Sequence, residues 1–337
     1  MRRRALVFTG PRRASVTDEQ LGPPAPGQLL VSTRVSAISA GTELLVYRGD
    51  LPADLPLDDT LPSLAGEAAW SYPLRYGYAA VGQVIAVGDG VAPSWVGRRI
   101  FSFQPHASAF TVSADDAWSV PDEIDDEKAA LLANAETAVN VVLDAGPRVG
   151  ERVVVFGQGV VGLLVTKLLG HFPLQHLIVV DAVPARAARG RALGAGTAVS
   201  SLADARAAVG ADGVDLAIEL TGNPAALNDA IAITGREGRV VVGSFYGRKQ
   251  TTIDLGGHFH RGRLRIISSQ VSRIGPALAG RWDRARRRDV AWDLLRRTDV
   301  AGWITHRFPF HEAPQVYAQL DQGTPGMLQV LLTYEEA

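Results

Sequence analysis

Short apolar stretches separated by turn residues mark the N-terminal third of the chain. They lie at residues 5–8, 28–37, 78–87, 98–103 and 109–112. Extended segments at such close spacing favour a compact β-rich unit such as a small barrel. Between two of them, residues 49–76 are rich in Pro, Asp and Leu without a clear period, which predicts a long binding loop. Trp70, Tyr72 and Tyr76 would give that loop an aromatic surface.

From about Asp126 onward, helical and extended patterns alternate. A helical stretch over 129–144 comes first, and strand candidates follow at 152–156, 177–180, 216–219, 239–243 and 264–267. Alternation of this kind predicts a parallel sheet with helices on both faces. The rest of the chain predicts an arginine-rich helix over 281–297, a segment over 306–317 and a closing apolar strand over 328–333.

Length, charge and cysteine content narrow the classes of function. The chain has 337 residues, enough for two domains that each bury a core. Its 34 basic and 35 acidic side chains leave a formal charge of -1, which argues against nucleic acid or a membrane surface as partner. Arg2-Arg3-Arg4 is followed by too short an apolar run for a signal peptide, so we expect a cytoplasmic protein. Without cysteine, a metal site would need His and carboxylate ligands.

A dinucleotide fingerprint follows the first strand of the alternating region. Residues 152–156 run into Gly157-Gln158-Gly159-Val160-Val161-Gly162, and a helical pattern continues to Leu169. Gly157 would permit the tight turn, Gly159 the approach of backbone N–H groups to a pyrophosphate, and Gly162 the packing of helix on strand. The phosphates would then lie at the helix N-terminus. A glycine-rich turn that binds nothing is the plainer alternative.

Asp181, at the end of the second strand, indicates which dinucleotide is bound. An acid in this place accepts hydrogen bonds from the adenosine ribose hydroxyls. Its charge would repel a 2′-phosphate, so we predict NAD; Arg186 or Arg189 could reach such a phosphate, which leaves NADP open.

With this fingerprint after a β-rich half, the chain resembles the medium-chain dehydrogenase/reductase superfamily nearly from end to end. The resemblance rests on motifs in the family's order and spacing: Ser36-Ala37-Ile38-Ser39-Ala40-Gly41-Thr42-Glu43, Gly77-Tyr78-Ala79-Ala80-Val81-Gly82, Thr137-Ala138, Gly194-Ala195 and Ile304-Thr305-His306-Arg307-Phe308-Pro309-Phe310. It implies an α/β fold with a GroES-like β-barrel catalytic domain and a Rossmann doubly wound parallel sheet for the cofactor. Substrate would enter the cleft between them.

The departures from the family pattern concern zinc. Zinc-dependent members carry a cysteine where this chain has Ala40, a His-Glu pair at Tyr78-Ala79, and a third ligand near Ala133. The segment Gln104-Pro105-His106-Ala107-Ser108 stands in place of the four-cysteine structural lobe. The chain therefore resembles zinc-independent members, and residues 41–45 are most similar to the bacteriochlorophyllide dehydrogenase branch, which interconverts an alcohol and a ketone.

Hydrogen-bond donors would have to replace the metal as stabilisers of negative charge on the substrate oxygen. Tyr78 is the first candidate, with packing into the vacated space as the alternative. Thr42 matches the hydroxyl that relays a proton in zinc-dependent relatives. His106 could protonate substrate, although a surface loop histidine is commoner. Glu43 could orient Tyr78 or an arginine, or fix a loop through an ion pair.

Several further residues are candidates for the cofactor site, a metal site or a surface contact. The resemblance implies that Thr137 touches the nicotinamide ring and that Ser244, Phe245 and Ser269 border it at strand ends. His258 and His260 have a spacing that could chelate a metal from a strand, although Phe259 and Arg261 favour an interface or phosphate contact. The cluster Arg284, Arg286, Arg287 and Arg288 is interrupted by acids and is interpreted as a solvated helix face.

These observations predict a zinc-independent oxidoreductase that moves a hydride between NAD(H) and a small-molecule alcohol/ketone pair. The predicted domains are a catalytic one over 1–137 and 272–337 and an NAD(P)-binding one over 138–271. An NADPH-dependent enoyl or quinone reductase and a non-catalytic dinucleotide sensor are the alternatives. By resemblance, the last strand of the cofactor sheet pairs with its copy, so a homodimer is expected.

Overall fold

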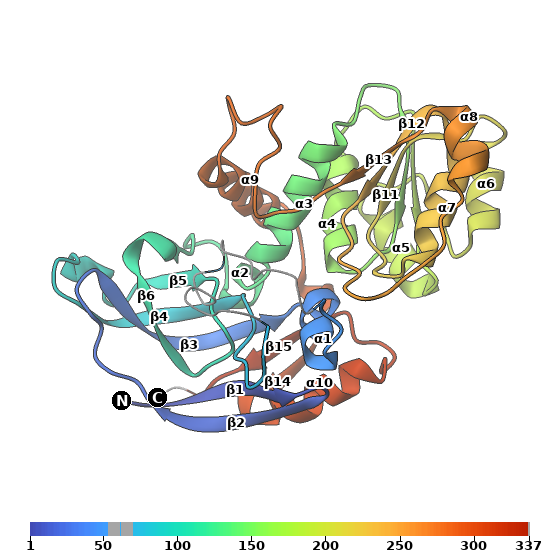
Figure 1. Cartoon of the computed structure of the whole chain (residues 1–337). Helices are drawn as coiled ribbons and strands as arrows, with labels where there is room; N and C mark the ends of the chain where they lie inside the picture. Colours follow the sequence, from blue (N-terminus) through green and yellow to red (C-terminus); the bar gives the residue numbers. More distant parts are fainter. Residues whose placement is uncertain (53–60, 62–69, 336–337) are drawn as a thin grey trace. The chain divides into compact units, whose positions relative to one another are not determined.

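The computed structural model describes residues 1–52, 61 and 70–335, so most of the predicted loop over 49–76 lies outside the described residues. The chain divides into two compact units (Figure 1). Unit 1 contains Met1–Ala133 and Leu295–Ala337, and unit 2 contains Asn134–Leu294. The second change of unit comes later in the chain than the predicted one at residue 272, because the arginine-rich helix groups with unit 2. No helix in the described part has the length and apolar character needed to cross a membrane.

Unit 1 is built on a mixed sheet whose centre is the long strand β3. The strands, in spatial order, are β14 (Ile304–Pro309), β15 (Gln329–Thr333), β3 (Gln28–Ile38), β4 (Ala80–Val87), β5 (Arg99–Ser102) and β7 (Trp118–Ser119), with β6 (Ala109–Ser113) also on β3. β1 (Arg2–Gly10) and β2 (Arg13–Gln20) form a separate antiparallel pair. Because β15 pairs antiparallel with β3, the C-terminal segment completes a sheet begun by N-terminal residues.

Among the described residues of unit 1, three α-helices accompany these strands: α1 (Ala40–Arg48), α2 (Asp126–Ala129) and α10 (Ala313–Asp321). α1 ends at Gly49, which has a left-handed φ of 76° and donates its N–H to Val46, as helix-ending glycines do. Its buried face joins α10, where the rings of Tyr47 and Tyr317 lie 5.6 Å apart between centroids. α1 therefore presents Glu43, on the same buried face, to the interior of unit 1.

Unit 2 is a six-stranded sheet in which every pair is parallel. The strands, in spatial order, are β10 (Thr197–Val199), β9 (His176–Val180), β8 (Arg152–Phe156), β11 (Val214–Glu219), β12 (Thr234–Val242) and β13 (Arg265–Ser268). In chain order this is 3-2-1-4-5-6, the Rossmann arrangement, whose ligands bind at the carboxyl ends of the strands near the reversal between β8 and β11. The predicted fold class is confirmed.

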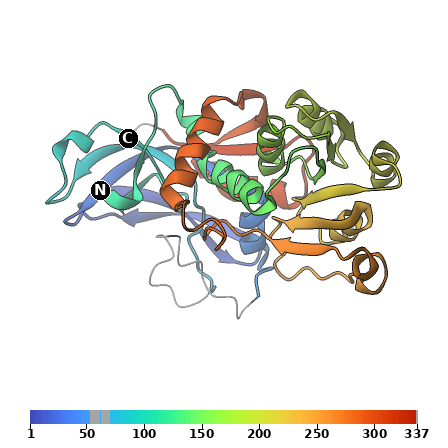
Figure 2. The same ribbon diagram turned by 90° about the horizontal axis from the view of Figure 1, so that it is seen from above.

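Helices cover both faces of the unit 2 sheet (Figures 1 and 2). They are α3 (Leu132–Ala145), α4 (Val160–Leu169), α5 (Pro184–Ala192), α6 (Leu202–Val209), α7 (Ala225–Ile233) and the short α8 (His260–Gly262), whereas α9 (Arg284–Arg296) packs against α3. The central strands β8, β9 and β11 are almost continuously apolar, since both of their faces are buried.

The predicted helix over 129–144 is wrong in one respect: residues 126–145 form two helices, α2 and α3. The strand β14 also occupies the first part of the segment 306–317, ahead of α10. The expected aromatic surface is wrong for Tyr76, which is 4% exposed. Trp70 and Tyr72 likewise pack against the core of unit 1.

The prediction of a wholly solvated arginine face on α9 is also wrong. Arg287 is 3% exposed, because one helix position in about four points back toward the protein. Its guanidinium donates to Asn140 Oδ1 at 2.9 Å and approaches Glu136 Oε1 at 3.5 Å. Ser269 and Asp144 continue this network, since Asn140 Nδ2 donates to both. These five residues, called the Arg287 group below, hold α9 to α3 and to the end of β13.

Candidate functional site

The three glycines of the turn after β8 have different surroundings. Gly157 has a φ of +90°, and a Cβ there would lie 2.7 Å from the carbonyl oxygen of Leu220, after β11. A Cβ on Gly162 would lie 1.9 Å from the carbonyl oxygen of Gly157, so α4 can pack this close to the turn only with glycine. Gly159 is the N-cap of α4, and no described atom lies within 4 Å of its Cβ position. That open space leaves room for a ligand at the start of the helix.

The other residues of this turn are more enclosed. The Gln158 side chain is fully buried; its Nε2 donates to the Gly157 carbonyl at 3.1 Å and its Oε1 accepts from Thr166 Oγ1 at 3.1 Å. Val160 is buried and Val161 is partly buried on the first turn of α4. Gln158, Val160 and Val161 therefore offer a ligand their backbone rather than their side chains.

Asp181 follows β9, and two backbone N–H groups fix its carboxylate. Gln158 donates to Oδ2 at 2.7 Å, and Val183 donates to Oδ1 at 2.8 Å. The first bond ties the end of β9 to the glycine turn. Each carboxylate oxygen has a further lone pair that can accept from a ligand hydroxyl. Arg186 lies in the first turn of α5 and is partly buried.

The remaining predicted cofactor residues also lie in unit 2. Ser244 and Phe245 follow β12, and Ser269 follows β13, so all three are at the carboxyl edge of the sheet, as Gly157 is. Ser244 Oγ accepts from the Gly222 N–H at 2.9 Å, whereas Phe245 is 42% exposed. Thr137 is partly buried on α3.

Glu219 is a residue of this edge that the sequence analysis missed. It is fully buried at the end of β11 and accepts from the Thr221 N–H at 2.6 Å and from the Tyr246 hydroxyl. Burial, and then the Glu219 carboxylate, raise the pKa of Tyr246 far above its ordinary value. Glu219 therefore joins the loops after β11 and β12, and the available signal was a single acid closing an apolar strand.

In unit 1 the structure brings two predicted catalytic residues, Glu43 and His106, into contact. Glu43 Oε2 lies 2.9 Å from His106 Nε2, and both side chains are fully buried. Glu43 Oε1 also accepts from the Ser39 N–H at 2.7 Å. The expectation of a surface loop histidine is wrong, and Glu43 pairs with His106 rather than with an arginine.

Three hydroxyl groups that the sequence analysis missed complete this arrangement. Ser36 Oγ lies 2.7 Å from His106 Nδ1 and 2.8 Å from the Tyr334 hydroxyl, and the Tyr317 hydroxyl donates to Glu43 Oε2. Burial, and then the Glu43 charge, raise the pKa of Tyr317 well above its ordinary value. Ser36, Glu43, His106, Tyr317 and Tyr334 are called the Glu43 group below.

Tyr78 and Thr42, the other predicted catalytic residues, adjoin this group. Both are partly exposed, and hydrogen bonds link the Tyr78 hydroxyl to the side chains of Ser39 and Thr42. Burial, and then the nearby Glu43 charge, raise the pKa of Tyr78 to about 12, although the two hydrogen bonds oppose this. The phenol is therefore a protonated hydrogen-bond donor at neutral pH.

Gly77 makes room for the His106 ring. Its φ is +124°, and a Cβ there would lie 2.7 Å from His106 Cδ2 and 2.8 Å from Nε2. The ring is held at both nitrogens and so cannot move aside. The glycine before Tyr78 is thus required by a histidine distant in sequence.

The positions that bind zinc in zinc-dependent relatives do not supply ligands here. Ala40 opens α1, Tyr78-Ala79 precede β4, and Ala133 lies in α3. Across residues 1–52, 61 and 70–335, no three His, Cys, Asp or Glu side chains converge on a point where a metal ion could bind. A catalytic zinc takes three protein ligands. The described side chains therefore do not fit a zinc ion.

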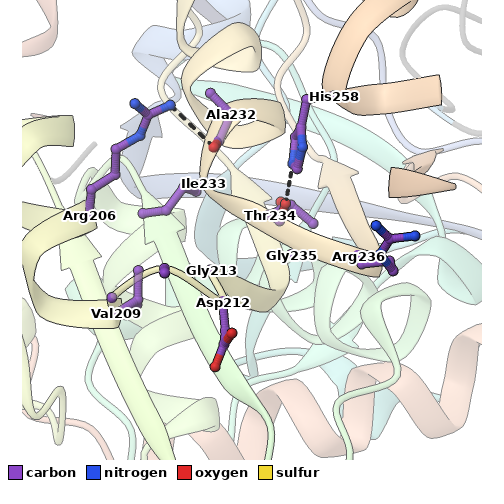
Figure 3. A pocket seen from close by; sticks show the side chains of 12 residues that line it. Arg206, Val209, Asp212, Gly213, Ala232, Ile233, Thr234, Gly235, Arg236 and His258 are labelled. Carbon is purple, nitrogen blue, oxygen red and sulfur yellow. Dashed lines mark hydrogen bonds between the residues drawn. The ribbon is translucent and has the colours of Figure 1, made fainter. Parts of the chain in front are cut away.

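A pocket of about 580 Å³ in unit 2 lies away from the glycine turn (Figure 3). Its lining includes residues just before β11 and at the start of β12, which is the amino edge of the parallel sheet. There Arg206 donates to the Ala232 carbonyl at 3.2 Å, and His258 Nε2 donates to the Thr234 carbonyl at 2.7 Å (Figure 3). His258 and His260 belong to helical turns, not to a strand, so the spacing argument for a metal does not apply.

Comparisons with known proteins agree with this architecture. A family model described as zinc-binding dehydrogenase matches residues 160–285. The (R,R)-butanediol dehydrogenase of Bacillus subtilis (strain 168) is 30% identical over 252 residues, which cover 66% of this chain and 71% of that protein. The L-threonine 3-dehydrogenase of Aeromonas salmonicida (strain A449) is 28% identical over 356 residues, covering 93% and 95%.

A solved structure shares the fold at lower identity. It is the short chain alcohol dehydrogenase (rspB) of Escherichia coli CFT073 in complex with NADH, with a TM-score of 0.78 and 21% identity over 98% of this chain and 99% of that one. The sequence relatives and the family model together identify the family. The chain therefore belongs to the zinc-binding dehydrogenase family and is an NAD(P)-dependent oxidoreductase of the medium-chain dehydrogenase/reductase superfamily.

Proposed function

We propose that this protein transfers a hydride reversibly between a nicotinamide dinucleotide and an alcohol/ketone pair, with Tyr78 in place of zinc as the group that polarises the substrate oxygen. The observation that carries the proposal is the Tyr78 phenol, partly exposed, protonated, and hydrogen-bonded to Ser39 and Thr42 beside Glu43. The dinucleotide, when bound, supplies or accepts the hydride. Unit 1 is then the catalytic domain and unit 2 the cofactor domain.

The phenol acts on the charge that develops during reduction of the ketone. As hydride arrives at carbon, the carbonyl oxygen becomes an alkoxide, and a donor already aimed at it stabilises the transition state more than the ground state. Thr42 holds the phenol in place. Glu43 and His106 are both fully buried. They therefore act on the Tyr78 phenol and do not contact the substrate.

We propose that the backbone of residues 157–162 binds the pyrophosphate and that Asp181 accepts from the ribose hydroxyls. Thr137, Ser244, Phe245 and Ser269 would border the nicotinamide ring. NAD is the proposed cofactor, since the Asp181 carboxylate opposes a 2′-phosphate. The KM for NADH is expected to be at least about tenfold below that for NADPH. Equal KM values would mean that a cationic side chain binds the 2′-phosphate of NADPH. Loss of NADPH use in Arg186→Ala would identify Arg186 as that side chain.

Replacing the phenol tests the catalytic assignment. In Tyr78→Phe, kcat with the best ketone is expected to fall at least about tenfold while the Kd for NADH, measured by fluorescence, stays unchanged. Tyr47→Phe is the matched control, because the Tyr47 hydroxyl donates to the Arg12 carbonyl and not to any residue of the Glu43 group. An unchanged kcat in Tyr78→Phe would reduce Tyr78 to a packing residue.

Elemental analysis tests the proposed independence of zinc. The dialysed protein is expected to contain far less than one zinc atom per chain while turning over ketone. One retained atom per chain would overturn the metal-free mechanism. Stopped-flow oxidation of bound NADH with ketone, enone and quinone panels then separates carbonyl reduction from the two other reductase activities, and a sensor would bind NADH without oxidising it.

We also propose a homodimer joined at β13. Among the described strands, β13 is hydrogen-bonded to β12 alone, and its Ile266 is 38% exposed. An open apolar strand edge is a ready site for pairing with a second copy. Light scattering of the purified protein distinguishes dimer from monomer, and a monomeric mass would remove this part of the proposal.

A further inference from the structure

His106 is held at both ring nitrogens, and this fixes where its hydrogen lies. A carboxylate can only accept, so Nε2 donates to Glu43. In a neutral ring Nδ1 then accepts from the Ser36 hydroxyl, and Ser36 accepts from the Tyr334 hydroxyl. Three hydrogen bonds therefore run in one direction from Tyr334 to Glu43.

The same heavy atoms accommodate a protonated ring with the direction of two bonds reversed. An imidazolium donates from Nδ1 to Ser36, which then donates to Tyr334, while Nε2 still donates to Glu43. Ser36 and His106 are fully buried, whereas Tyr334 is partly exposed. Tyr334 is therefore the outer end of a hydroxyl path along which His106 can gain or lose a proton.

The charges around Glu43 explain why His106 would take up a proton. Three phenols face this carboxylate, those of Tyr78, Tyr317 and Tyr334, and Glu43 disfavours ionisation of each. If Tyr78 gave up its proton, its phenolate would lie beside the fully buried carboxylate of Glu43. Among the described residues, His106 is the one basic side chain paired with Glu43. The positive charge that balances the phenolate would therefore have to form on His106.

We propose that His106 is a charge-compensating residue, which takes up a proton at Nδ1 through Tyr334 and Ser36 when Tyr78 releases its proton to the substrate oxygen. This inference rests on the proposed function for the role of Tyr78. The Tyr78 O–H bond breaks as the alcohol O–H bond forms. At the other end, Tyr334 receives a proton from the medium, passes its own to Ser36, and Ser36 passes its own to His106. The net charge of the interior stays constant.

The cycle then closes without any further reactant. After the alcohol leaves, the Tyr78 phenolate takes a proton from the medium, and His106 returns its proton through Ser36 and Tyr334. Overall, one proton from the medium ends on the alcohol. His106 never touches the substrate, so it is a positioning residue for charge rather than a catalytic residue.

A double-mutant cycle separates compensation from simple structural support. In the parent protein, which keeps Glu43, His106→Gln is expected to lower kcat at least about tenfold. The Tyr78 phenolate then forms beside a carboxylate whose charge nothing balances. In Glu43→Gln, which removes that negative charge, the same substitution is expected to change kcat by less than about threefold. Equal effects in both backgrounds would overturn the proposal.

The hydroxyl path has its own test. Ser36→Ala is expected to lower kcat at least about tenfold and to flatten its dependence on pH between about 6 and 9, whereas Ser36→Thr, which keeps a hydroxyl, restores both. Ser32→Ala, on the same strand but away from the group, is the matched control. Identical kinetics in Ser36→Ala and Ser36→Thr would show that no proton passes through this position.

The protonation state of His106 can be measured without turnover, so this inference can be tested separately from the proposed function. Tyr78→Glu places a fixed negative charge where the phenolate would form, and Tyr78→Gln is its neutral match. In nitrogen NMR of histidine-labelled protein, His106 is expected to be protonated at both ring nitrogens in the first and at Nε2 alone in the second. The same protonation state in both would refute charge compensation, whatever the substrate. Failure of the parent to reduce any ketone would refute the proposed function alone.

Discussion

The two units each bury an acid beside a base, but the bases differ in what they can do. The Glu43 group pairs a carboxylate with histidine and three hydroxyls, all of which can donate, accept and exchange protons. The Arg287 group pairs a carboxylate with a guanidinium, which does not release its proton. The first arrangement is suited to chemistry and the second to holding α9 against α3. Burial of a charged pair is therefore no sign of function until the chemistry of the base is considered.

Breaking the Arg287 group is expected to have the largest effect on stability. Arg287→Met leaves the Glu136 carboxylate buried without its cation, which costs about 3 to 5 kcal/mol of unfolding free energy. Urea unfolding followed by circular dichroism measures this loss. Arg286→Met, at an exposed position of the same helix, is the control and is expected to cost less than about 1 kcal/mol. Similar losses in the two variants would mean that the buried pair adds nothing.

Breaking the Glu43 group through the backbone is expected to cost less stability and more activity. Gly77→Ala adds a Cβ at a left-handed φ and against the fixed His106 ring, so about 1 to 3 kcal/mol should be lost together with most of kcat. Gly90→Ala, also at positive φ but with no described atom within 4 Å of its Cβ, is the control for strain alone. Equal stability and undiminished turnover in both variants would mean that the ring of His106 does move aside.

The smallest effect expected is on the pH dependence of stability. Burial raises the pKa of Glu136 above 4.5, although Arg287 opposes this. The folded state then binds the proton more tightly than the unfolded state, so this contribution is present below pH 4.5 and is lost as pH rises through the folded pKa. Glu136→Gln is expected to flatten the decline, as seen in urea midpoints between pH 4 and about 7. A parallel curve would contradict the assignment to Glu136.

The sequence predicted those parts of the fold and the site whose residues are close together in the chain. The glycine turn of residues 157–162 could be predicted because turn, strand and helix are adjacent in sequence and each glycine meets a nearby atom. The partners of Glu43 could not. Tyr317 lies 274 residues away in sequence, and its single hydroxyl carries no pattern. Likewise, nothing local distinguishes Arg287 from Arg286; only the direction in which α9 packs does so.

The closing strand β15 has a consequence for synthesis on the ribosome. Strand β15 pairs with β3, and Tyr317 and Tyr334 complete the Glu43 group, yet residues 134–294 are made before either tyrosine. Because domains generally fold as units while the chain emerges, the nucleotide-binding half can fold first. The Glu43 group of the other half cannot assemble until the last part of the chain is translated. A nascent chain that stalls before β15 would therefore bind dinucleotide yet turn over no substrate.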